Sequence, residues 1–91
     1  MDSRDVSILV VDDTVVYRRI MSKVVEELQG TVLMGTATNG KLALQKMERT
    51  RPDLVFLDVE MPEMDGLETL KAIRASYPEV GVIMVSGANK S

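Results

Sequence analysis

The stretch PDLVFLDVEMPEMDGLE, residues 52–68, decides the fold that we expect for this chain. Pro52 ends the preceding segment, and the continuous apolar run at residues 54–57 predicts a strand that ends at Asp58. Pro62 and Gly66 punctuate a loop that leads into the next apolar pattern. An uninterrupted apolar strand is typical of a parallel sheet that helices cover on both faces.

The segments before and after this stretch alternate between strand and helix patterns. Strands are predicted at residues 8–11, 31–37, 54–57 and 80–85, and helices at residues 16–28, 41–49 and 67–77. The first helix has an apolar stripe that we expect to face the core, consisting of Val16, Ile20, Val24 and Leu28, joined by Met21 and Val25. Strand–helix alternation implies parallel strands, so the expected fold class is α/β, an open parallel sheet in βαβαβαβ order. No repeat or linker divides the chain, and we expect one domain, residues 1–91.

The composition excludes several classes of function. The sequence has no cysteine and no histidine, which excludes disulfide scaffolds, thiolate or imidazole metal sites and Ser-His catalysis. A formal net charge of −3 and scattered basic residues argue against direct binding to nucleic acid. The apolar runs are too short to span a bilayer, and the polar, acidic start does not resemble a signal peptide. We therefore expect a soluble, cytoplasmic protein.

Oxygen-bearing residues follow three of the four predicted strands. Asp12 and Asp13 follow the first strand, Asp58 ends the third and Ser86 follows the fourth. Ligands bind beyond the carboxyl ends of the strands in open parallel sheets, so these side chains are expected at one edge. Close carboxylates repel one another unless a cation neutralises them, and Mg²⁺ prefers such oxygen ligands. A carboxylate can also act as a nucleophile, which suggests a magnesium-assisted aspartyl-phosphate site with a hydrogen bond from Ser86.

Three motifs resemble the receiver domains of bacterial response regulators across essentially the whole chain: ILVVDD (residues 8–13), PDLVFLDVEMPEMDGLE (52–68) and VIMVSGA (82–88). The resemblance implies a flavodoxin-like fold and a two-component signalling function, in which a sensor histidine kinase phosphorylates Asp58. It also implies that Asp12, Asp13, Asp58 and the backbone carbonyl of Glu60 hold Mg²⁺, and that Ser86 is the switch hydroxyl. The segments GTATNGKLAL and MPEMDGLETL look closest to chemotaxis-type receivers, including the methylesterase group.

The resemblance breaks at the end of the sequence. Receivers continue through another helix, a fifth strand and a fifth helix, and the family's site lysine follows that fifth strand. This sequence ends at Ser91, and Lys90 does not match the lysine position. We therefore expect an incomplete fold with impaired phosphorylation. We also expect a homodimer or higher oligomer that forms through the uncovered surface.

Other interpretations remain open from the sequence alone. Each acid taken singly would be a helix cap or a solvated loop residue, and Ser86 a turn residue. Arg18 and Arg19 lie on the predicted exposed side of the first helix, where receivers meet their kinase, although a solvated helix face explains them more simply. A haloacid dehalogenase-type phosphatase would need Asp-x-Asp after the first strand, and a flavodoxin-like cofactor binder would need a phosphate loop there. An inactive, self-associating fragment is the third alternative. The sequence favours a signalling phosphoacceptor over an enzyme.

Overall fold

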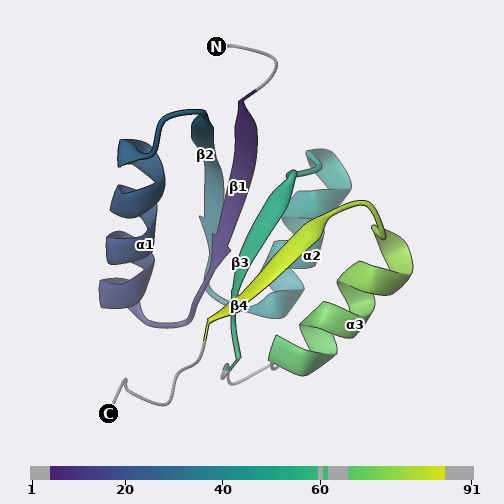
Figure 1. Ribbon diagram of the computed structural model, residues 1–91. Helices are drawn as coiled ribbons and strands as arrows, with labels where there is room; N and C mark the ends of the chain where they lie inside the picture. Colours follow the sequence, from purple (N-terminus) through teal and green to yellow (C-terminus); the bar gives the residue numbers. More distant parts are fainter. Residues whose placement is uncertain (1–4, 60, 62–65, 86–91) are drawn as a thin grey trace.

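The computed structural model describes residues 5–59, 61 and 66–85. Within them, four strands alternate with three helices (Figure 1). The elements are β1 (Val6–Val11), α1 (Val15–Glu27), β2 (Thr31–Ala37), α2 (Gly40–Arg49), β3 (Leu54–Asp58), α3 (Gly66–Ser76) and β4 (Gly81–Val85). The strands form one sheet in the order β2-β1-β3-β4, and every neighbouring pair is parallel. The predicted α/β class and the predicted order are therefore confirmed.

The sheet separates two apolar clusters, as the alternation of side chains along a strand requires. One cluster joins the inward-facing residues of β1 and β3 to the helices α2 and α3. Its members include Leu9, Val11, Val55 and Leu57 from the strands and Ala43, Met47 and Ile73 from the helices.

The other cluster joins Ile8 and Val10 of β1 to Val25 of α1. Partly buried apolar residues pack around it: Met21, Leu33, Leu54 and Phe56. Helix α1 thus covers one face alone, whereas α2 and α3 cover the opposite face.

The predicted orientation of α1 is wrong for four of the six residues of its apolar stripe. Val25 is fully buried and Met21 is half-buried, but Val16, Ile20, Val24 and Leu28 are exposed, Val16 by 60%. Val25 and Met21 lie four positions apart on the helix face that meets Ile8 and Val10. The apolar residues cover so much of the helix surface that α1 could pack on the sheet in two rotations about its axis. Packing against β1 favours the rotation that also turns Arg18 toward the site.

Burial on the α1 face decreases from β1 to the sheet edge at β4. Val10, Phe56 and Ile83 are register partners on three neighbouring strands. Val10 is 1% exposed, Phe56 is half-buried and Ile83 is 48% exposed. Helix α1 lies over β1 and β2, so its cover ends before it reaches β4 (Figure 1). Among the described residues, no helix has the length and apolar character needed to span a membrane.

Candidate functional site

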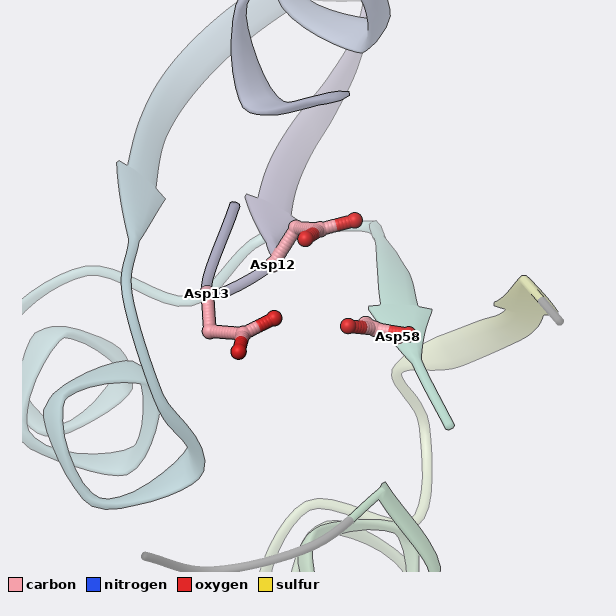
Figure 2. Close-up of side chains that lie close together, drawn as sticks. All are labelled: Asp12, Asp13 and Asp58. Carbon is pink, nitrogen blue, oxygen red and sulfur yellow. The ribbon is translucent and has the colours of Figure 1, made fainter. Parts of the chain in front are cut away.

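Three carboxylates meet where β1 and β3 end. Val11 and Leu57 are register partners on adjacent parallel strands, so the residues that follow them, Asp12 and Asp58, lie side by side. Asp13 is the next residue along the chain. One carboxylate oxygen from each of the three acids lies within 4.8 Å of the other two. Figure 2 shows the three side chains pointing toward a common space between the strand ends.

The three acids differ in their exposure to water. Asp58 is 1% exposed and Asp12 is 3% exposed, whereas Asp13 is exposed. Buried carboxylates need hydrogen bonds or a counter-charge, because a desolvated charge without them is costly. The site therefore combines two buried carboxylates, Asp12 and Asp58, with a solvent-exposed one, Asp13.

Hydrogen bonds hold the backbone and the side chain of Asp12. Its amide donates to the carbonyl of Ala37 over 3.1 Å, which extends the contact between β1 and β2 by one residue. Its Oδ1 accepts from the amide of Thr14 over 2.9 Å. Its carbonyl oxygen accepts from Nη1 of Arg18 over 2.9 Å. These contacts fix the turn between β1 and α1 that carries both Asp12 and Asp13.

The segment after Asp58 depends on close contact with Gly66. The Gly66 amide donates to the carbonyl of Val59 over 2.9 Å, and the Val59 amide donates to the carbonyl of Val85 over 3.1 Å. A Cβ atom at Gly66 would clash with the carbonyl oxygen of Asp58 and would lie 2.6 Å from Cα of Val59. The interpretation of Gly66 as a loop-shaping residue stays a prediction, because residues 62–65 lie outside the described ones, but the clash gives a steric reason for glycine at the start of α3.

The donor set fits a hard divalent cation. All three groups offer carboxylate oxygen, and three negative charges so close together favour a bound cation. Opposite oxygen ligands of Mg²⁺ lie roughly 4.2 Å apart, because each Mg–O bond is about 2.1 Å. A spread of up to 4.8 Å is therefore compatible with Mg²⁺ when one carboxylate shifts slightly or binds through a water molecule.

The predicted site residues fall into two groups. Asp12, Asp13 and Asp58 come together as the sequence predicted. Glu60, Ser86 and Pro62 lie outside the described residues. Val85, the residue before Ser86 in the sequence, is the register partner of Asp58. Sequence reasoning missed the bond from Arg18 to Asp12, because the first helix was predicted in an orientation that left Arg18 exposed.

The family follows from comparison with known proteins. Residues 8–91 match the model of the response regulator receiver domain. A protein-glutamate methylesterase/protein-glutamine glutaminase of Trichodesmium erythraeum is 51% identical over 79 residues, which cover 87% of this chain and 22% of that protein. A protein with the same description from a Nocardioides species is 49% identical over 81 residues, covering 89% of the chain and 22% of the relative. The chain thus spans about a fifth of the length of these curated relatives.

A solved structure agrees with this result. The response regulator domain of Thermotoga maritima CheB superposes with a TM-score of 0.86 at 34% identity, over 92% of this chain and 62% of that one. The predicted likeness to receivers of the methylesterase group is confirmed by these relatives. The chain belongs to the response regulator receiver domain family.

Proposed function

We propose that Asp58 accepts a phosphoryl group from a sensor histidine kinase, at a Mg²⁺ site formed by Asp12, Asp13, Asp58 and the backbone carbonyl of Glu60. The observation that carries this proposal is the convergence of three carboxylates from two neighbouring strand ends within 4.8 Å. Asp58 is assigned as the nucleophile because it ends β3, within the residues that match the family, and because the motif resemblance gives this position the phosphoacceptor role. Glu60 takes its role from the family resemblance alone.

The chemistry is an in-line transfer between nitrogen and oxygen. A carboxylate oxygen of Asp58 forms a bond to phosphorus while the phosphorus–nitrogen bond of the phosphohistidine breaks. The electron pair of that bond goes to the imidazole nitrogen, which takes up a proton, and Asp58 becomes an acyl phosphate. A bound Mg²⁺ would offset the negative charge of the carboxylates and of the phosphoryl oxygens.

The protein supplies position and shielding for this step. Asp58 is 1% exposed, so its carboxylate has a fixed place and little competing water around it. Asp12 and Asp13 would hold the cation, and the hydroxyl of Ser86 would donate a hydrogen bond to a phosphoryl oxygen. With these roles, the chain is a signalling phosphoacceptor, and residues 1–91 form one domain. We place its function in the cytoplasm, where the kinase would present its phosphohistidine.

The test is intact-mass analysis of the chain after incubation with Mg²⁺ and a small phosphoramidate donor. We expect a slow gain of one phosphoryl group, in line with the expected impairment, that is absent in Asp58→Asn and present in Asp5→Asn. The control removes the same charge at the opposite end of β1, before the strand begins. A phosphorylated Asp58→Asn variant would contradict the assignment of the acceptor.

A second part of the proposal concerns self-association. Ile83 of β4 and the α1 residues Val16, Ile20 and Val24 are exposed apolar side chains on the α1 side of the sheet. Strand β4 is also an edge of the described sheet. Apolar side chains beside a sheet edge favour pairing with another chain, so we propose that two copies associate through this surface. The phosphatase alternative is disfavoured, because Asp12-Asp13-Thr14 is not Asp-x-Asp.

A further inference from the structure

Arg18 connects the first helix to the acidic site. It lies one turn into α1, and its Nη1 donates to the backbone carbonyl of Asp12 over 2.9 Å. The side chain is half-buried, whereas that of its neighbour Arg19 is exposed. The arginine thus reaches back along the helix start to the strand end that carries the carboxylates.

The acceptor of this bond lies in a buried part of the site. Asp12 is 3% exposed, and a carbonyl group with little access to water needs a hydrogen-bond partner. The same residue is held at its amide by Ala37 and at its Oδ1 by the amide of Thr14. The arginine contact adds a bond from a charged side chain, which is stronger than a neutral one.

The bond also places a positive charge beside the acidic cluster. The guanidinium lies within hydrogen-bond distance of the Asp12 main chain, and Asp12 shares its site with Asp13 and Asp58. A cation near like charges reduces their mutual repulsion before any metal binds, but it also repels Mg²⁺, so the loss of this charge alone would favour Mg²⁺ binding. The contact therefore acts on the geometry and on the electrostatics of the turn.

We propose that Arg18 is a positioning residue of the magnesium site: its bond to the Asp12 carbonyl holds the Asp12-Asp13 turn so that both carboxylates face Asp58. This inference rests on the proposed function of the acidic cluster. Loss of a residue that orients a metal ligand without touching the metal typically weakens metal binding about 10- to 100-fold.

If Arg18 only stabilised the fold, its replacement would lower stability and Mg²⁺ affinity together. The Arg18 side chain borders a hollow of about 260 Å³ whose other lining residues are Val15, Arg19, Ser22 and Thr36. Water can enter the space left by a shorter side chain and bond to the Asp12 carbonyl, so the loss of stability is expected to be small. Water does not fix the direction of the turn, so metal affinity is expected to change more than stability.

The experiment compares Arg18→Gln with Arg19→Gln by calorimetric titration with Mg²⁺ and by urea unfolding of the metal-free chains. Both variants remove one positive charge from adjacent positions, but only Arg18 bonds to the site. We expect Arg18→Gln to weaken Mg²⁺ binding about tenfold and Arg19→Gln to leave it within about twofold of the parent chain. Arg18→Lys, which keeps the charge on a shorter side chain, should fall between them and also guards against a misfolded glutamine variant.

The outcomes separate the two claims. Equal affinities for Arg18→Gln and Arg19→Gln, with the parent chain binding Mg²⁺, would overturn the role of Arg18 and leave the metal site in place. A parent chain that does not bind Mg²⁺ would refute the proposed metal site itself and the inference with it. Weakened binding that tracks an equal loss of unfolding free energy would identify Arg18 as a general stabilising residue and overturn the proposal.

Discussion

At the scale of single residues, two contacts hold Asp12 in the acidic cluster: its Oδ1 accepts from the Thr14 amide, and its carbonyl oxygen accepts from Nη1 of Arg18. The cluster of Asp12, Asp13 and Asp58 could be predicted because the three acids follow two apolar strand patterns inside motifs that resemble those of receivers. The contacts of Thr14 and Arg18 with Asp12 depend on the direction of the turn and on the rotation of α1. No local sequence pattern predicts the direction of that turn or the rotation of α1, so these supporting contacts became visible only in the structure.

Gly66 offers a test at the same scale. Gly66→Ala places a methyl group against the backbone at Asp58 and Val59, which cannot move aside as a flexible side chain would. We expect a loss of about 2 kcal/mol in the free energy of unfolding, measured with urea, together with slower phosphorylation of Asp58. Gly35→Ala is the matched control, because nothing lies within 4 Å of its added Cβ. Equal stability of the two variants would contradict the steric account.

At the scale of elements, strands were easier to predict than helix orientation. Strand β2 has the predicted bounds, and β3 and β4 differ from their predictions by one residue. A strand buried on both faces needs only an apolar run, whereas a helix must also choose which side of its apolar surface to bury. In α1 the apolar positions span a broad arc, and the choice depended on packing with Ile8 and Val10.

Adjacent valines in α1 test this orientation. Val25 is fully buried against Ile8 and Val10, whereas Val24 is exposed. We expect Val25→Ala to lower the free energy of unfolding by about 2 kcal/mol through lost burial and a cavity. Val24→Ala should change it by no more than about 0.5 kcal/mol in the same urea titration. The reverse ranking would mean that the side of α1 carrying Val24, and not the side carrying Val25, faces the sheet.

At the scale of the whole molecule, the parallel order of the strands creates the site. The order β2-β1-β3-β4 makes β1 and β3 neighbours, although β1 ends at Val11 and β3 begins only at Leu54. The alternation of elements predicted parallel strands, and the family resemblance predicted their flavodoxin-like arrangement. The sequence around Val10, Phe56 and Ile83 did not predict that their exposure increases in this order, because exposure there depends on where α1 lies over the sheet.

Self-association is the prediction that belongs to this scale. Ile20→Ser and Ile83→Ser each remove an exposed apolar side chain from the α1 side of the sheet, and we expect both to weaken dimers in analytical ultracentrifugation. Leu67→Ser is the control, because Leu67 is also exposed but belongs to α3, which covers the opposite face. A parent chain that sediments as a monomer at every concentration tested would exclude the proposed dimer.

The central claim is that three carboxylates from two strand ends form one magnesium-dependent phosphoacceptor site. The most direct measurement is the yield of phosphorylated chain, by intact mass, across a series of Mg²⁺ concentrations for the parent chain and for Asp13→Asn. We predict that phosphorylation requires Mg²⁺ and that Asp13→Asn needs a higher Mg²⁺ concentration for the same yield, because one cation ligand is lost. An equal yield in the presence of a chelator, or the same Mg²⁺ requirement in both chains, would contradict the account.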